Sequence, residues 1–163
     1  MLFTIITVCF NSEKTIERTI QSVLNQTCQD YEYLIIDGAS TDGTMEIVRK
    51  YEPLFQGRMR WISEKDQGIY DAMNKGIGKA SGELIGIVNS DDYYEPDALA
   101  IMKNLYTGYQ YSILYGAVRA VKDGRETMVY IKNHEFIEQD MITHPSCFIS
   151  KKLYDTFGGY SLE

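Results

Sequence analysis

The 163-residue sequence has few cysteines and no long apolar segment, and each shortage excludes a class of protein. Its three cysteines, Cys9, Cys28 and Cys147, are widely spaced and odd in number, which argues against a disulfide framework and against a zinc site. The longest apolar runs, 1–10 and 84–88, fall far short of the roughly 20 residues that cross a bilayer. The first run lacks the basic flank and cleavage site of a secretory signal, so the cytoplasm is the expected compartment.

The sequence also lacks an excess of positive charge. It has 16 Lys and Arg residues against 23 Asp and Glu residues, which gives a formal net charge of −7 at pH 7. Binding to a nucleic-acid backbone requires positive charge that displaces counterions, so this balance argues against a nucleic-acid partner. With 44% hydrophobic residues, the chain can bury one ordinary core, which predicts a single domain or most of one.

Several familiar active-site fingerprints are missing as well. No G-x-G-x-x-G follows the first apolar run and no G-x-x-x-x-G-K-[ST] occurs, so classical dinucleotide and P-loop ATPase functions lose their main support. No G-x-S-x-G elbow is present, and both histidines, His134 and His144, lie late in the chain, which disfavours a hydrolase triad. His144, which precedes Pro145, could contact a metal or a phosphate, but a surface or hydrogen-bonded histidine is the simpler expectation.

The sequence does contain β-branched apolar runs that alternate with segments of helical periodicity. This pattern is typical of βαβ units around a mostly parallel sheet flanked by helices, an α/β fold. The expected strands of this part are residues 3–9, 33–37, 59–63 and 84–88. The expected helices follow them, at residues 16–25, 45–51, 69–80 and 97–102, with Asn11 and Ser12 as caps of the first helix and Pro53 as the stop of the second.

After residue 105 the pattern changes to short alternating segments. Residues 112–116 and 126–131, separated by a turn at 122–124, predict a small antiparallel part. A further strand at 147–149 and a short helix at 151–157, which ends at a Gly-Gly pair, are expected to follow.

The segment Asn89-Ser90-Asp91-Asp92 directly follows the fourth expected strand. Open α/β sheets place their ligand sites at the carboxyl ends of strands, so this segment lies where a site is expected. The adjacent carboxylates of Asp91 and Asp92 suit a hard cation such as Mg²⁺ or Mn²⁺ and leave positions for phosphate oxygens. The alternative is that they cap the following helix or belong to a turn.

Four other residues end strands at the same edge. Asp37 ends the second strand, where it could accept a hydrogen bond from a nucleobase or a ribose. Alternatively, it bonds the backbone of residues 38–40 as a turn residue. Thr7, Phe10 and Asn11 close the first strand and could line the same crevice, although a helix cap is the simpler role for Asn11.

In combination, these segments resemble family 2 glycosyltransferases of the GT-A fold. The resemblance covers almost the whole chain and rests on the order of four motifs, which are ITVCFN at 6–11, IIDGASTDGT at 35–44, NKG with ASGE at 74–83, and NSDD at 89–92. The stretch EKDQGIYDAMN at 64–74 further resembles the enzymes that build bacterial exopolysaccharide, capsule or lipopolysaccharide O-chains.

The resemblance implies a nucleotide-sugar donor, usually a UDP-sugar. It implies that Asp37 lies near the uracil with Thr7 beside it, and that Asp66 faces the nucleotide. In the resembling enzymes, the acceptor is a polysaccharide or a lipid-linked sugar at the inner face of a bacterial membrane.

The resemblance also implies a bound Mg²⁺ or Mn²⁺, with Asp91 as the first candidate ligand and Asp92 beside it. Such a cation neutralises the negative charge that develops on the departing nucleoside diphosphate. The family motif usually opens with an aspartate, but this chain has Asn89, a neutral amide that weakens the expected metal affinity. Ser90 could contact the ribose or a bound water.

Within a single GT-A domain, residues 1–105 are expected to form the nucleotide-sugar-binding half and residues 106–163 the start of the acceptor-side half. Inverting transfer requires a general base near the acceptor hydroxyl. In the resembling family this acidic residue follows a Gly-Gly-Tyr segment, here 158–160, so the base is expected beyond Glu163. We therefore expect a fragment that binds donor but transfers sugar poorly, with any peripheral membrane association supplied by the missing part.

Two other functions remain open from the sequence. A sugar-phosphate nucleotidyltransferase would share the architecture, but it requires a glycine-rich basic loop where this chain has Asn-Ser-Glu-Lys at 11–14. A non-catalytic module that binds a nucleotide or a glycan is favoured if the complete chain also lacks the later acidic base.

Overall fold

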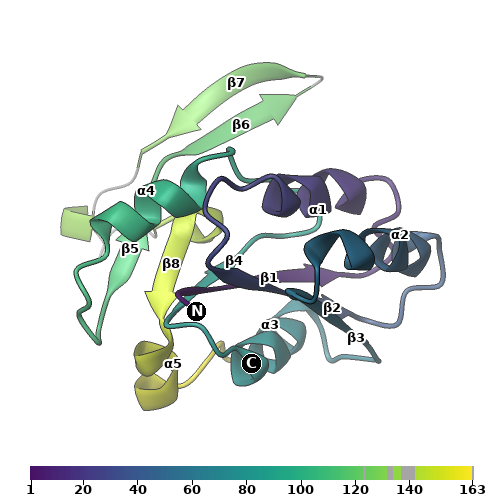
Figure 1. Ribbon diagram of the computed structural model, residues 1–163, viewed down its shortest axis with the longest axis horizontal. Helices are drawn as coiled ribbons and strands as arrows, with labels where there is room; N and C mark the ends of the chain where they lie inside the picture. Colours follow the sequence, from purple (N-terminus) through teal and green to yellow (C-terminus); the bar gives the residue numbers. More distant parts are fainter. Residues whose placement is uncertain (123, 132–133, 137–141, 163) are drawn as a thin grey trace.

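The computed structural model describes residues 1–122, 124–131, 134–136 and 142–162 (Figure 1). Asp123, in the expected turn at 122–124, lies outside the described residues. The first half of the chain contains β1 (Phe3–Cys9), α1 (Ile16–Leu24), β2 (Tyr31–Asp37), α2 (Thr44–Tyr51), β3 (Met59–Ser63), α3 (Ile69–Lys79), β4 (Leu84–Ile87) and α4 (Ala98–Leu105). The second half contains β5 (Ile113–Tyr115), β6 (Val118–Lys122), β7 (Arg125–Tyr130), β8 (Cys147–Ser150) and α5 (Lys151–Phe157).

The main sheet has six strands in the order β3-β2-β1-β4-β8-β5. Strands β1 to β4 are parallel, whereas β8 runs antiparallel to β4 and β5 runs antiparallel to β8. This arrangement confirms the predicted α/β class with a mostly parallel sheet and an antiparallel C-terminal part. The order also brings the carboxyl ends of β1, β2 and β4 together at one edge, because these strands are parallel neighbours.

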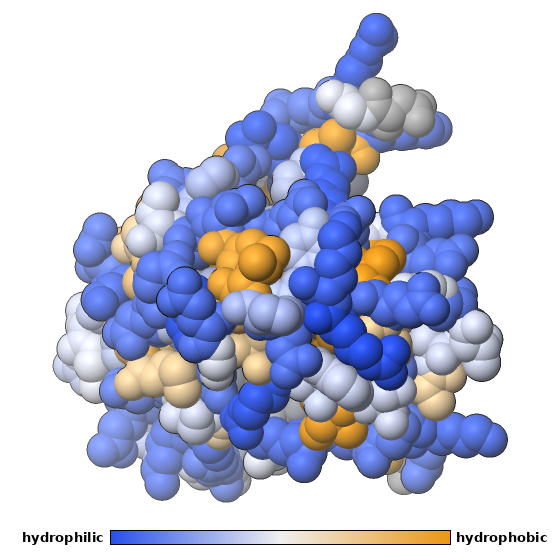
Figure 2. All heavy atoms as spheres, turned by 45° about the vertical axis from the view of Figure 1, so that its right-hand side comes forward, coloured by the Kyte–Doolittle hydropathy of each residue, from blue (hydrophilic) through white to orange (hydrophobic). Residues whose placement is uncertain are grey.

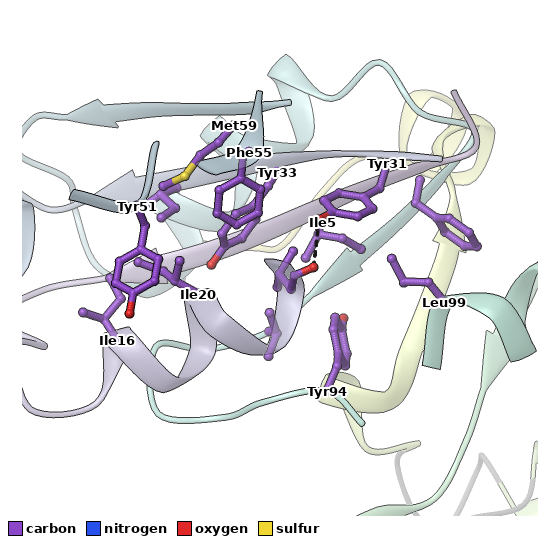
Figure 3. Packing of buried hydrophobic residues seen from close by; sticks show 14 of the residues in the cluster. Ile5, Ile16, Ile20, Tyr31, Tyr33, Tyr51, Phe55, Met59, Tyr94 and Leu99 are labelled. Atoms are coloured by element: carbon purple, nitrogen blue, oxygen red, sulfur yellow. Dashed lines mark hydrogen bonds between the residues drawn. The ribbon is translucent and has the colours of Figure 1, made fainter. Parts of the chain in front are cut away.

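Both faces of the sheet are covered, which explains the unbroken apolar runs of the central strands. All residues of β1 and β2 are buried. On one face, α1 and α2 pack Ile16, Ile20 and Val48 against Tyr33 and the neighbouring strand residues (Figure 3). On the other face, α3 contributes a second, smaller core with side chains from β1, β2 and β4.

The antiparallel part differs from the expected pairing. Residues 112–116 were expected to belong with 126–131, but β5 joins the main sheet beside β8, and β7 pairs with β6 instead. The β6–β7 hairpin is a separate two-stranded sheet at the top of the view in Figure 1. The second helix, α2, ends at Tyr51, just before Pro53 as expected, and a 3₁₀ turn, Glu52–Phe55, follows it.

Polar side chains cover most of the face turned forward in Figure 2, and its hydrophobic patches are small and separate. Among the described residues, no helix has the length and apolar character that a membrane crossing requires.

Candidate functional site

A cavity of about 780 Å³ opens at the edge where the parallel strands end. Its walls come from the loop after β1, the loop before α3 and the segment after β4. Of the predicted site residues, the structure brings six together around this cavity: Phe10, Asn11, Asp66, Asn89, Ser90 and Asp91. The three others, Thr7, Asp37 and Asp92, do not line it.

The loop after β1 is held by hydrogen bonds that cross to the loop after β2. The Asn11 backbone N–H donates to Ser40 Oγ at 2.8 Å, and Asn11 Oδ1 accepts from the Thr41 N–H at 2.9 Å. Asn11 has a φ of 49°, a left-handed conformation that asparagine adopts more readily than most residues. The helix α1 begins at Ile16 after an N-cap at Thr15, so Asn11 does not cap it as expected. Asn11 instead connects the loop after β1 to the loop after β2.

Asp37 is fully buried beneath the cavity, and its carboxylate is occupied by protein donors. It accepts hydrogen bonds from the Ser40 N–H at 3.0 Å, from the Ser40 hydroxyl, and from Ser63 Oγ at 2.6 Å. Cys9 Sγ lies 3.6 Å from Asp37 Oδ1, the oxygen that also accepts from the Ser40 hydroxyl, and burial together with the Asp37 charge raises the pKa of this thiol. The turn role that the sequence allowed for Asp37 is therefore present in the structure.

Thr7 is also fully buried, and its hydroxyl accepts a hydrogen bond from Tyr33 Oη at 2.9 Å. Direct contact of Thr7 and Asp37 with a nucleotide, expected from the resemblance, stays a prediction. In the structure, Asp37 holds the loop after β2 through Ser40, whereas Thr7 bonds Tyr33 in the core.

Two residues of the cavity wall, Phe10 and Asp66, lie close to Gly38. A Cβ atom on Gly38 would lie 2.7 Å from Asp66 Oδ2 and 3.4 Å from Phe10 Cδ2, so the glycine lets these two side chains approach. Asp66 Oδ1 accepts from the Gly68 N–H at 3.0 Å, and Phe10 is 62% exposed. Lys75 of α3 holds the same loop, with Nζ 3.1 Å from the Glu64 carboxylate.

The segment after β4 presents one exposed and one half-buried carboxylate, those of Asp91 and Asp92. Burial, and then the negative charge of Asp91, raise the pKa of Asp92. Asn89 Nδ2 donates to Asp92 Oδ2 at 3.4 Å, and Ser90 Oγ lies 2.8 Å from Ser12 Oγ. The Asn89 side-chain oxygen is buried without a hydrogen-bond partner in the described part of the chain.

These features fit a divalent cation, because a cation would relieve the repulsion between Asp91 and Asp92. Within the described ranges, however, no three His, Cys, Asp or Glu side chains are grouped closely enough to hold a metal ion. The protein therefore offers an incomplete oxygen ligand set, to which phosphate oxygens and water would have to add, as is common for Mg²⁺.

His144 lines a smaller cavity of about 280 Å³ together with residues of β4 and β8. Burial lowers the pKa of His144, while the Asp92 charge acts in the opposite direction. Its Nε2 atom is buried and has no hydrogen-bond partner among the described residues, unlike the surface or hydrogen-bonded histidine that was expected.

Comparison with known proteins identifies the family. Residues 4–162 match the family model described as glycosyl transferase family 2. A PGL/p-HBAD biosynthesis glycosyltransferase from Mycobacterium bovis is 30% identical over 163 residues, which cover 99% of this chain and 64% of that protein. The chain thus spans less than two thirds of the length of such curated relatives.

Solved structures show the same fold. TarS from S. aureus in complex with UDP aligns with a TM-score of 0.78 and 22% identity, over 99% of this chain and 51% of that one. The mannosyltransferase PcManGT from Pyrobaculum calidifontis, in complex with GDP-Man and Mn²⁺, aligns with a TM-score of 0.73 and 22% identity, over 99% and 48%. The fold is therefore GT-A, as predicted, and the chain belongs to glycosyl transferase family 2.

Proposed function

We propose that this chain is the donor-binding part of an inverting glycosyltransferase that moves a sugar from a UDP-sugar to a polysaccharide or lipid-linked acceptor. The cavity that gathers Asn11, Asp66 and Asp91 at one sheet edge carries the proposal. Support comes from the two structural neighbours, which hold UDP or GDP-Man. The whole protein would then take part in the synthesis of bacterial surface polysaccharide at the inner face of the plasma membrane.

In this proposal, Asp91 and Asp92 hold a Mn²⁺ or Mg²⁺ ion. Once bound, the cation neutralises the charge of the departing nucleoside diphosphate. Asp66 and Asn11 face the nucleoside, and the exposed ring of Phe10 offers it an apolar surface.

The remaining predicted residues contact the ribose, hold the loops in place or lie outside this chain. Ser90, with Ser12 beside it, supplies hydroxyl groups for the ribose or a bound water. Asp37 fixes the loop after β2 through Ser40, while Thr7 bonds Tyr33 in the core. The general base is assigned to an acidic residue that follows Glu163 in the complete protein.

Titration calorimetry with UDP and with GDP, each with and without Mn²⁺, tests the proposal. We expect Mn²⁺-dependent binding of UDP that is tighter than that of GDP and is lost in Asp91→Ala. Asp155→Ala is the matched control, since Asp155 lies on α5, away from the cavity residues, and pairs with Lys151 at an exposed site. Absence of nucleotide binding by the folded wild-type chain would overturn the proposal, and binding without any transfer by the complete protein would favour the non-catalytic module.

A further inference from the structure

The loop between β3 and α3 carries Asp66 to the wall of the donor cavity, which is the cavity of about 780 Å³ at the sheet edge. A single lysine of α3 makes three contacts that hold this loop. Lys75 Nζ lies 3.1 Å from the Glu64 carboxylate and 3.2 Å from the Asp71 carboxylate. It also donates a hydrogen bond to the backbone carbonyl oxygen of Lys65 at 3.0 Å. A lysine ammonium has three N–H donors, so these three acceptors match its full donor capacity.

The contacts hold the loop on both sides of Asp66. Lys75 binds the two residues that precede it directly. Gln67, which follows it, donates its backbone N–H to Asp71 Oδ2 at 3.0 Å. The same oxygen of Asp71 lies 3.2 Å from Lys75 Nζ, one turn further along α3. Lys75 and Asp71 therefore act on the loop as one unit.

This network is more sheltered than an ordinary surface ion pair. The side chains of Lys75 and Asp71 are 23% and 19% exposed, whereas that of Glu64 is 55% exposed. Fully exposed pairs fix little, because water competes for both groups and both side chains are mobile. Lys75 also offsets the charges of Glu64 and Asp71, two carboxylates close in sequence to that of Asp66.

From this network we infer that Lys75 is a positioning residue for donor binding, which fixes the loop so that the Asp66 carboxylate faces the nucleotide. Lys75 does not line the cavity itself, so it acts through Asp66 and not through the ligand. A loop that is fixed in advance loses less conformational freedom when the nucleotide binds, which raises the affinity. This inference rests on the proposed function, because it takes the cavity to be the donor site.

A matched pair of lysine substitutions isolates the network. Lys75→Met keeps an unbranched side chain of similar length but removes its charge and its three donors. Lys79→Met is the control, because Lys79 lies one turn further along α3 at an exposed position. Arg60 contacts only the backbone carbonyl oxygen of Lys79, which this substitution leaves in place.

The first measurement is the solvent exchange of backbone amide protons, followed by NMR in the ligand-free chain. Lys75→Met is expected to speed the exchange of the Gln67 amide at least about fivefold, because the loop opens more often without its anchor. The Ser40 amide, which is bound by Asp37 in the loop after β2, should keep its wild-type rate. Lys79→Met should change neither amide. An unchanged rate at Gln67 in Lys75→Met overturns the inference, whatever the result with UDP.

The second measurement is a double-mutant cycle of Lys75→Met and Asp66→Ala, with UDP affinity measured by titration calorimetry in the presence of Mn²⁺. In the wild-type chain, Lys75→Met is expected to raise the UDP dissociation constant at least about fivefold. In the Asp66→Ala chain, the same substitution should change it by less than about twofold, because the residue through which Lys75 acts is gone.

The cycle separates positioning from a general effect on the fold, which would weaken UDP binding equally in both chains. Equal effects of Lys75→Met with and without Asp66 would therefore overturn the inference. If the folded wild-type chain does not bind UDP, or if Asp66→Ala binds it with wild-type affinity, the proposed function fails instead. In that case the exchange rate at Gln67 still decides whether Lys75 holds the loop.

Discussion

Gly38→Ala is the substitution that most selectively disturbs the donor cavity. The added methyl group would lie 2.7 Å from Asp66 Oδ2, whereas an ordinary contact begins near 3.4 Å, so the carboxylate must move by about 0.7 Å. A shift of that size breaks the hydrogen bond that the Asp66 carboxylate would accept from a bound nucleotide, and a hydrogen bond to a charged group is worth about 1.5–3 kcal/mol. The expected result is a UDP dissociation constant raised about 12- to 140-fold.

Titration calorimetry with UDP and Mn²⁺ measures this effect, and thermal unfolding measures its cost to the fold. Gly78→Ala is the control, because its methyl group meets no atom within 4 Å and an exposed helix gains about 0.5–1 kcal/mol from such a change. If Gly38→Ala binds UDP with wild-type affinity while remaining folded, Asp66 does not contact the nucleotide and the assignment of this wall is refuted.

Three further predictions concern buried carboxylates. Glu32→Ala should lower the free energy of unfolding by about 1–3 kcal/mol in urea denaturation, because the buried Thr4 hydroxyl, the Ser81 hydroxyl and Arg60 lose their common partner. Burial alone would raise the pKa of Glu32, but its hydrogen bonds hold that pKa below the usual value, so this stabilisation is present at neutral pH and fades as pH falls below about 4. Asp92→Asn should raise the melting temperature at neutral pH. The raised pKa of Asp92 means that its ionised form destabilises the fold, and this effect disappears when the carboxylate is protonated at low pH. A gain in melting temperature that persists at about pH 3 would contradict this. Asp37→Ala should lower the melting temperature and weaken UDP binding together, whereas weaker UDP binding at an unchanged melting temperature would point to direct contact.

The sequence predicted the parallel half of the sheet because its strands are buried on both faces and so appear as unbroken apolar runs. It missed β6 for a local reason. The β6–β7 ladder has a register shift between Ala120 and Val121, which interrupts the alternation of apolar and polar residues in Val118–Lys122. Without that alternation, 126–131 was matched to the clearer segment at 112–116.

For the candidate site too, only part of the arrangement could be predicted from the sequence. Parallel neighbouring strands must end at one edge, so the meeting of Asn11, Asp66 and Asp91 could be predicted from the order of the motifs. The direction of each side chain could not be predicted, because successive strand residues face opposite sides of the sheet. The polar atoms of Thr7 and Asp37 bond to protein groups and do not line the cavity.

The central claim is that the cavity between Asn11 and Asp91 holds a nucleoside diphosphate together with a divalent cation. A crystal structure of this chain with UDP and Mn²⁺, with data collected at the manganese absorption edge, tests it most directly. The account predicts an anomalous peak bonded to Asp91 and a diphosphate oxygen, with the uridine between Phe10 and Asp66. UDP bound in any other cavity, or bound here with no manganese at Asp91, would contradict it.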